Sequence, residues 1–246
     1  MKRVINFLIN INILIVSFSL GIFDQIYQKK IIKKFKKIFD KEIDMVFDVG
    51  AHKGEFTNLL LKNFSVNAIE LFEPNYKNFE YLKNNIKQKN INLNNYALGE
   101  KEEEKKFKLM KESASSTLSE INKNTKYFKR KNFILNLGLN SDTFEEIDIK
   151  IYDSSRVIKD KKIDVIDLLK IDTEGHEYFV LKGFKEDIIK VKVVFFEHHY
   201  DQMIIKNYTF SDIHKYLKSK NFIQNSKFKM PFRKSFEYIY INNNFF

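Results

Sequence analysis

Carboxylates follow four apolar segments of the sequence, and these acids are the residues best placed to do chemistry. Each segment has the length and composition of a buried strand. The acids are Asp48, Glu73, Asp172 and Glu197. Because strand ends form the ligand crevice of an open parallel sheet, we expect these side chains to gather in one site. A single acid, or Thr173, could instead cap a helix, but four together favour a binding site.

A glycine loop of the kind that receives a nucleotide-type cofactor follows the first acid. After Asp48 the chain runs Val-Gly-Ala-His-Lys-Gly, and a helical pattern then begins. Gly50 and Gly54 permit a tight turn and a close approach of the backbone to a ligand. Glu73 comes about 20 residues after this loop, where a carboxylate can accept both hydroxyls of a ribose. The order of these features favours cofactor binding.

Four motifs together are typical of one enzyme family. They are Asp-Val-Gly-Ala-His-Lys-Gly-Glu-Phe at 48–56, Phe-Glu-Pro-Asn at 72–75, Ala-Leu-Gly at 97–99 and Leu-Lys-Ile-Asp-Thr-Glu-Gly-His-Glu at 169–177. With them the chain resembles, over roughly residues 43–245, the FkbM-type S-adenosylmethionine-dependent methyltransferases. The resemblance implies a class I methyltransferase fold, which is α/β, Rossmann-like and doubly wound, with a mostly parallel seven-stranded sheet and helices on both faces.

The resemblance also implies a cofactor, an acceptor and the residues that bind the cofactor. The cofactor is expected to be S-adenosyl-L-methionine, and the acceptor a hydroxyl of a glycan, a glycolipid or a sugar-bearing metabolite. The expected cofactor-binding residues are Asp48, Gly50, Ala51, His52, Gly54, Glu73, Pro74, Ala97 and Asp172. His52 stands where many methyltransferases have a glycine, which leaves the pose of the methionine moiety open. The alternatives are an RNA or protein methyltransferase and a catalytically silent binding module.

A sugar hydroxyl is a poor nucleophile at neutral pH, so the reaction calls for a base. His176 is the predicted base, because imidazole titrates in the useful range and this residue lies close behind a strand end. Asp172 and Glu174 are predicted to orient His176 or to bind the acceptor. His198 and His199 are second choices, and an ordinary surface position for His176 is the plain alternative.

Composition indicates one globular catalytic domain, expected at residues 42–246. The chain has 246 residues, of which 43% are hydrophobic and 15% aromatic, so it can bury an ample core. Cysteine is absent, which excludes disulfides, thiolate nucleophiles and zinc–thiolate sites. No metal is expected, although an alternative metal site could draw on Asp172, Glu174, Glu197 and His198.

The first 41 residues are expected to form a separate segment, with an apolar helix followed by a basic stretch. Residues 4–23 contain no ionisable side chain and have the length of a membrane span. They include asparagines that are costly in lipid, so a membrane anchor or interfacial helix, a helix docked on the domain and a signal peptide all stay open. Six lysines between positions 29 and 37 favour anionic headgroups. We therefore expect membrane association through residues 4–37, and a cytoplasmic location on the inner face of the membrane.

The net charge of +11 does not predict a nucleic-acid partner. Residues 1–41 contain nine Lys or Arg against two Asp, so the rest of the chain is close to balanced. An enzyme that modifies RNA would be expected to carry a basic stripe across its catalytic body. No nucleic acid is therefore expected.

The hydrophobic pattern predicts alternating strands and helices. Strands are expected near 45–49, 67–72, 92–97, 104–109, 147–152, 165–171, 191–197 and 236–241, and helices near 55–63, 75–88, 154–160, 175–186 and 211–219. Residues 123–140 are interpreted as an inserted flap. A polar turn at 113–117 is expected, from the family resemblance, to lie close to the cofactor and the acceptor.

Overall fold

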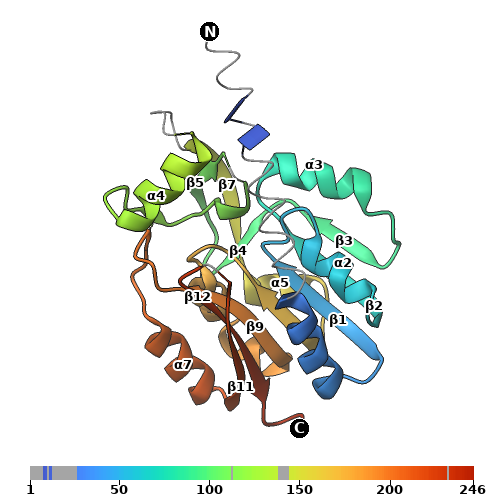
Figure 1. Cartoon of the computed structure of the whole chain (residues 1–246). Coiled ribbons are helices and arrows are strands. Elements are labelled where there is room, and N and C mark those ends of the chain that lie inside the picture. Colours follow the sequence, from blue (N-terminus) through green and yellow to red (C-terminus); the bar gives the residue numbers. More distant parts are fainter. Residues whose placement is uncertain (1–7, 10, 13–26, 112, 138–143, 232) are drawn as a thin grey trace.

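The computed structural model describes residues 8–9, 11–12, 27–111, 113–137, 144–231 and 233–246 (Figure 1). These residues form a central seven-stranded sheet with helices on both faces, and a separate sheet of three strands. The order across the central sheet is β11-β12-β9-β8-β1-β2-β3. The predicted doubly wound, Rossmann-like α/β fold with a mostly parallel seven-stranded sheet is thereby confirmed.

Parallel pairing dominates the central sheet, and only β12 runs against its two neighbours. The strands are β1 (Glu42–Val49), β2 (Ser65–Phe72), β3 (Ile91–Asn94), β8 (Ile166–Ile171), β9 (Val191–His199), β11 (Phe222–Lys229) and β12 (Ser235–Asn242). The chain proceeds from β1 outward through β2 to β3, and later from β8 outward to β9. The strand order therefore reverses between β1 and β8, which is where sheets of this class bind ligands.

The pairing register aligns the carboxyl ends of four strands. Val49 pairs with Phe72 on one side and with Ile171 on the other, and Ile171 also pairs with Phe196. The residues that follow these four positions therefore come out side by side at one edge of the sheet.

Helices cover both faces of the central sheet and enclose two cores. They are α2 (Glu55–Leu61), α3 (Tyr76–Asn85), α5 (Ser154–Asp160), α6 (Glu177–Gly183), the 3-10 helix η2 (Lys185–Lys190) and α7 (Phe210–Ser219). One core lies between the sheet and α5, α6 and α7, and the other between the sheet, α2, α3 and a helix at residues 27–38. Strand alternation explains this division, since Phe47 joins the first core and Val46 the second.

The helix at residues 27–38 packs its apolar side on the sheet. Ile31 and Phe35 are buried, and the Phe35 ring lies 5.4 Å from that of Phe195 on β9. The lysines of this helix face outward, and all but one of the six are exposed. The division into residues 1–41 and 42–246 stays a prediction, although residues 27–39 share the second core.

The predicted apolar helix at residues 4–23 lies mostly outside the described residues and is not confirmed. Leu8, Ile9, Ile11 and Asn12 are described and are helical. Ile9 is buried, and the Asn12 amide donates to the carbonyl of Leu135 at 3.2 Å. Within the described parts of the chain, no helix is both long enough and apolar enough to cross a membrane.

Two smaller sheets and two short helices lie outside the central sheet. The three-stranded sheet has the order β4-β7-β5, and β6 pairs with β10. The bounds are β4 (Ala97–Gly99), β5 (Glu103–Met110), η1 (Ser113–Ser115), β6 (Glu120–Ile121), α4 (Lys126–Leu135), β7 (Phe144–Asp153) and β10 (Ile204–Ile205). The strands predicted at 104–109 and 147–152 are confirmed as β5 and β7.

Four parts of the predicted layout differ from the structure. The strand predicted at 92–97 divides into β3 and β4, and between them the Asn95 amide donates to the carbonyl of Glu73 at 2.9 Å. The flap predicted at 123–140 contains α4, whose N-cap Thr125 accepts from the Phe128 amide. Strand β11 was not predicted, because most of its residues are exposed and its apolar pattern is weak. The helix predicted at 175–186 is shorter and is followed by η2.

Candidate active site

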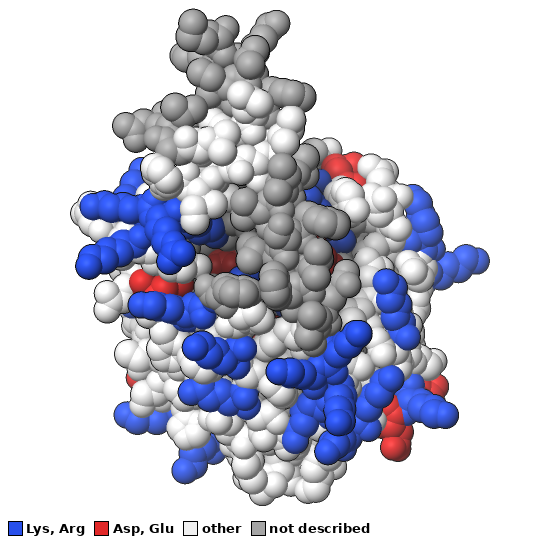
Figure 2. Space-filling model, in the orientation of Figure 1, with Lys and Arg blue, Asp and Glu red and all other residues white. Residues whose placement is uncertain are grey.

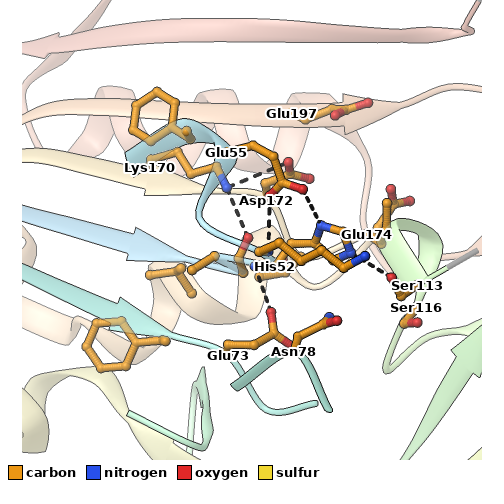
Figure 3. A pocket seen from close by; sticks show the side chains of 18 of the residues that line it. His52, Glu55, Glu73, Asn78, Ser113, Ser116, Lys170, Asp172, Glu174 and Glu197 are labelled. Carbon is orange, nitrogen blue, oxygen red and sulfur yellow. Dashed lines mark hydrogen bonds and ion pairs between the residues drawn. The ribbon is translucent and has the colours of Figure 1, made fainter. Parts of the chain in front are cut away.

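A cavity of about 1090 Å³ lies at the carboxyl ends of β1, β2, β8 and β9 (Figure 3). Its lining combines apolar side chains, such as Phe72 and Leu98, with the acids that follow the strands. The volume is at the upper end of the range for small-molecule sites, and it leaves room for two ligands side by side.

The glycine loop after β1 forms one wall of the cavity. Gly50 has φ of +79°, and a Cβ added there would lie 1.9 Å from the carbonyl oxygen of Asp172. Only glycine therefore allows the loops after β1 and β8 to approach so closely. Gly50, Ala51 and His52 line the cavity, whereas Gly54 is the N-cap of α2 and does not line it.

Glu73 lies almost fully buried in the wall of the cavity. Its Oε2 accepts from the His52 amide at 2.8 Å, and its Oε1 accepts from the Asn75 amide at 2.9 Å. Burial raises the pKa of Glu73 to about 7, even though these amide hydrogen bonds act in the opposite direction. The predicted Pro74 and Ala97 line the same cavity. The carboxylate of Glu73 is thus held in a fixed position.

His52 joins the glycine loop to the polar turn at 113–117. Its Nδ1 lies 2.9 Å from Glu55 Oε1, and its Nε2 lies 2.7 Å from Ser113 Oγ. Ser113 and Ser116 line the cavity, as Figure 3 shows. The polar turn therefore reaches the cavity, where the sequence predicted it.

Asp48 does not line the cavity, but it pairs with a buried cation that does. Lys170 of β8 lies 3.0 Å from Asp48 Oδ1 and 3.7 Å from Asp172 Oδ2, and it donates to the carbonyl of Gly50. The Thr57 hydroxyl donates to Asp48 Oδ2 at 2.7 Å. Burial would lower the pKa of Lys170, but the two carboxylates outweigh burial and raise it. The cofactor-binding role of Asp48 stays a prediction.

Sequence reasoning gave Lys170 no role, although a lysine inside a fully buried strand is a usable signal. Every residue of β8 is buried, and buried lysines are rare unless they are paired. Lys170 lines the floor of the cavity and links the ends of β1 and β8.

Glu177 holds the loop after β8 in place through hydrogen bonds. No role was predicted for this residue from the sequence. Its Oε1 accepts from the Gly175 amide at 2.8 Å and from the Thr173 hydroxyl at 3.2 Å. The Tyr208 hydroxyl donates to its other oxygen. Glu174 adopts φ of +50° and Gly175 φ of +99°, so this fastened turn directs the Glu174 side chain toward β9.

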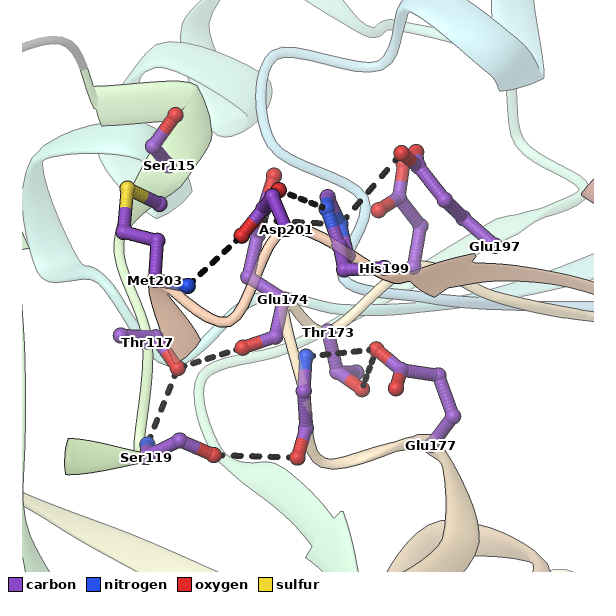
Figure 4. Close-up of polar contacts among 12 residues, drawn as sticks. Ser115, Thr117, Ser119, Thr173, Glu174, Glu177, Glu197, His199, Asp201 and Met203 are labelled. Atoms are coloured by element: carbon purple, nitrogen blue, oxygen red, sulfur yellow. Dashed lines mark hydrogen bonds and ion pairs between the residues drawn. The ribbon is translucent and has the colours of Figure 1, made fainter. Parts of the chain in front are cut away.

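Glu174 meets a histidine that is surrounded by carboxylates (Figure 4). His199 Nε2 lies 3.2 Å from Glu174 Oε2 and 3.3 Å from Glu197 Oε1, and Nδ1 lies 3.6 Å from Asp201 Oδ2. Burial lowers the pKa of His199, but the nearby Glu174 and Glu197 carboxylates outweigh burial. The pKa of His199 is therefore raised to about 10. Burial also raises the pKa of Glu174 above the usual carboxyl range, partly offset by His199. Glu174, Glu197 and His199 thus form one buried group of ionisable side chains.

The structure separates His176 from this group. The His176 ring packs 5.0 Å from the Phe179 ring, and its Nε2 has no hydrogen-bond partner among the described residues. It lines the cavity, yet burial lowers its pKa to about 4. The ring is therefore neutral at physiological pH and is a weak base. The predicted catalytic role of His176 stays a prediction.

His198 points away from the acids because it alternates with its neighbours along β9. Its ring lies 4.8 Å from that of Tyr200 and 6.0 Å from that of Tyr208. Burial lowers its pKa to about 3. The alternative metal site would have needed His198 beside Glu174 and Glu197. No group of metal-binding side chains was found within the described parts of the chain.

The family is decided by a match that covers most of the catalytic domain. A model of the methyltransferase FkbM domain matches residues 48–223. The chain belongs to the FkbM methyltransferase family. This confirms the resemblance seen in the motifs.

Two solved structures illustrate the similarity of fold. The FkbM methyltransferase from Methylobacillus flagellatus KT has a TM-score of 0.52 and 17% identity, over 82% of this chain and 44% of that chain. TrmK from M. capricolum, solved with S-adenosyl-homocysteine, has a TM-score of 0.48 and 11% identity, over 86% and 67% of the two chains. At these identities the likeness concerns the fold alone, and this chain spans less than half of the length of the first protein. No curated protein matched the sequence.

The residues around the cavity fit S-adenosyl-L-methionine. Glu73 offers a buried, fixed carboxylate to ribose hydroxyls, and Gly50 allows close approach to the backbone. The floor carries Asp172, Glu197 and Glu237, and Glu237 Oε2 has no hydrogen-bond partner within the described residues. Such an acidic floor suits a cofactor that carries positive charge on its sulfonium and its amino group.

Proposed function

We propose that the protein transfers the methyl group of S-adenosyl-L-methionine to a hydroxyl of a glycan, a glycolipid or a sugar-bearing metabolite. The observation that carries this proposal is the layout of the cavity. Glu73 lines one part of it and is suited to the cofactor, and Glu174, which pairs with His199 behind it, lines another and is suited to removing a proton. When bound, the cofactor supplies an electrophilic methyl group, so the acceptor has to supply a nucleophilic oxygen.

Glu174 is proposed as the residue that receives the proton of the acceptor hydroxyl. Its raised pKa matches the proton affinity that a general base needs near neutral pH. His199 stabilises the carboxylate form at 3.2 Å, and Asp172, whose side chain is 38% exposed, is free to bind the acceptor. His176 is kept as a competing candidate, because it lines the same cavity.

The membrane is proposed as the place where the protein works, on its cytoplasmic side. The exposed lysines of the helix at residues 27–38 support this, since they form a cationic face on a helix that is packed on the domain. Such a face favours anionic headgroups. A role for residues 4–23 as an anchor or interfacial helix is part of the same proposal.

Methylation of RNA or protein is the competing function. The near balance of charge outside residues 1–41 disfavours RNA. Some solved neighbours are described as putative RNA methyltransferases, but their TM-scores are below 0.5 and carry no weight here.

Glu73→Gln is expected to weaken binding of S-adenosyl-L-methionine by about 1.5–3 kcal/mol, which is roughly 10- to 150-fold. The amide keeps the shape of the side chain but loses the charge that strengthens hydrogen bonds from ribose hydroxyls. Isothermal titration calorimetry of the full chain measures the change. Glu80→Gln on α3 is the matched control, and its affinity should equal that of the unchanged protein.

The pH dependence of the same titration gives a second readout. Because the pKa of Glu73 is raised to about 7, its carboxylate form is present above that pH and is lost below it. Affinity should therefore fall as the pH drops through 7, and Glu73→Gln should remove this dependence. An affinity that Glu73→Gln leaves unchanged in a folded protein would exclude Glu73 from the cofactor site.

A further inference from the structure

Helix α4 presents a surface that the catalytic site does not use. It consists of Lys126, Lys129, Arg130, Phe133, Ile134 and Leu137, and is called the α4 surface below. Positions 126, 130 and 133 are three or four residues apart, so they lie along one side of the helix, and Leu137 follows directly after the C-cap Asn136. Phe133, Ile134 and Leu137 are 67%, 44% and 50% exposed. Three adjacent, exposed, large apolar side chains next to three cations are unusual on a free surface.

The opposite side of α4 is fixed to the domain, so the α4 surface is held in place. Phe128 is buried against Met203 and Ile204. The Lys131 ammonium donates to the Ser115 hydroxyl at 2.5 Å. This contact joins α4 to the polar turn at 113–117, which lines the cavity through Ser113 and Ser116.

The apolar part of the α4 surface continues onto the described part of the N-terminal segment. The Asn12 amide donates to the carbonyls of Ile134 and Leu135. Leu8 and Ile11, which precede Asn12 in the chain, are 49% and 38% exposed. The exposed apolar area is thus larger than α4 alone provides.

The positive charge of the α4 surface favours an anionic partner. Lys126, Lys129 and Arg130 form no ion pair with any acid among the described residues, so their charge is available to an anionic partner. Figure 2 shows Lys and Arg gathered at the upper left, where α4 lies, and again lower on the same face, where the helix at residues 27–38 lies. Cations beside exposed aromatic and aliphatic side chains are the pattern of an interfacial membrane helix. RNA would use the cations but would gain little from Ile134 and Leu137.

We propose that the α4 surface docks on an anionic lipid bilayer, with Phe133, Ile134 and Leu137 entering the headgroup boundary. The docking itself is independent of the acceptor. Combined with the proposed function, on which this step rests, it places the polar turn at 113–117 and the cavity beside the bilayer, so the acceptor class becomes a lipid-linked sugar.

Cosedimentation of the full chain with vesicles tests the docking. Phe133→Ser with Leu137→Ser, and separately Lys129→Glu with Arg130→Glu, should each weaken binding to phosphatidylserine and phosphatidylcholine vesicles by about tenfold or more. Lys215→Glu with Lys218→Glu, two exposed lysines of α7, and Ile223→Ser on β11 are the matched controls. The controls should bind like the unchanged protein, and vesicles of phosphatidylcholine alone should bind weakly.

A tryptophan reporter tests insertion directly, because the chain contains no tryptophan. In Phe133→Trp the emission should shift to the blue on addition of anionic vesicles, and brominated lipids should quench it. Ile223→Trp should show neither effect. Bilayer binding that both α4 double variants leave unchanged would overturn the proposal, and so would an unshifted Phe133→Trp emission on bound protein.

Two further measurements separate this proposal from its competitors. Loss of RNA affinity in the α4 variants, without vesicle binding by the unchanged protein, would identify RNA as the partner and overturn the proposal. Dimerisation that the variants abolish, again without vesicle binding, would identify a second copy. The affinity for S-adenosyl-L-methionine should stay unchanged in all α4 variants, so failure of docking is distinguishable from failure of the proposed function.

Discussion

Glu174→Gln is expected to lower kcat by about 10²–10⁴-fold and to leave the affinity for S-adenosyl-L-methionine nearly unchanged. The amide preserves the shape of the side chain and its position beside His199, but it cannot take up a proton. Glu174 lies 3.2 Å from that histidine in a buried group, so a substitute base cannot readily enter from water. A labelled-methyl transfer assay on a matched acceptor measures kcat, and calorimetry measures cofactor affinity.

The pH profile supports the same assignment. Burial raises the pKa of Glu174, so its basic form is complete only above the usual carboxyl range, and kcat should rise with pH through that raised pKa. His176 would give a different profile, because its pKa is lowered to about 4 and its basic form is already complete at neutral pH. The profile of the unchanged enzyme therefore distinguishes the two candidates.

His176→Ala and Glu186→Gln are the comparison variants. Glu186 is exposed on η2, pairs with Lys220 and does not line the cavity, so its change should leave kcat intact. If His176→Ala loses the factor of 10²–10⁴ and Glu174→Gln keeps its turnover, the base is the histidine, as the sequence predicted. Retained turnover in both variants would show that positioning alone carries the reaction.

Lys170→Met is expected to lower the free energy of unfolding by about 3–5 kcal/mol. The change leaves Asp48, which is fully buried, without the cation that lies 3.0 Å from it. Denaturant unfolding followed by circular dichroism measures the loss.

The double variant Lys170→Met with Asp48→Asn should recover part of this stability, since no unpaired charge is then buried. Lys182→Met on α6 is the control, because its exposed pair with Glu100 at 3.8 Å contributes about 1 kcal/mol or less. A loss for Lys170→Met as small as that of the control would contradict the structural role assigned to the Asp48 and Lys170 pair.

The sequence was sufficient to predict six of the seven strands of the central sheet, all but β11, and three of its four strand-end acids. Glu73 and Asp172 directly follow β2 and β8, and Glu197 lies near the end of β9. The parallel register brings the three acids to one cavity. Asp48 does not line the cavity, because it is the second-last residue of β1 and not the residue after the strand. Its neighbour on the adjacent strand β8 is Lys170. A shift of one position along a strand turns a side chain to the other face. The pattern of acids alone does not reveal this shift.

The grouping of Glu174 with His199 could not be read from the chain. It depends on positive φ angles at Glu174 and Gly175, which turn the glutamate toward β9 and leave His176 against Phe179. The sequence favoured His176 as the base because it lies near a strand end. The local backbone conformation determines which side chain contacts the other acids. The role of Glu177 also depends on a tertiary contact, since its hydrogen-bond partner Tyr208 lies 31 residues away along the chain.

Helix α4 was missed for a related reason. Its sequence is strongly basic, with Phe128 and Leu135 as its fully buried apolar residues, so its helical pattern is weak without the contact to Met203 and Ile204. The exposed Phe133 and Ile134 interrupt the expected alternation of polar and apolar sides. Their exposure becomes informative only once the buried side of the helix is known.

The most direct test of the proposed function is the chemical form in which the methyl group leaves the enzyme. The purified full chain is incubated with S-adenosyl-L-methionine that carries an isotopically labelled methyl group, together with a glycolipid extract, total RNA and a protein mixture in separate reactions. The label should appear in the glycolipid reaction as an alkali-stable methyl ether on a sugar, and Glu174→Gln should abolish it. Label in RNA or protein, with none in the glycolipid fraction, would contradict the proposed acceptor. Absence of label in every fraction, from protein that binds the cofactor, would contradict it as well.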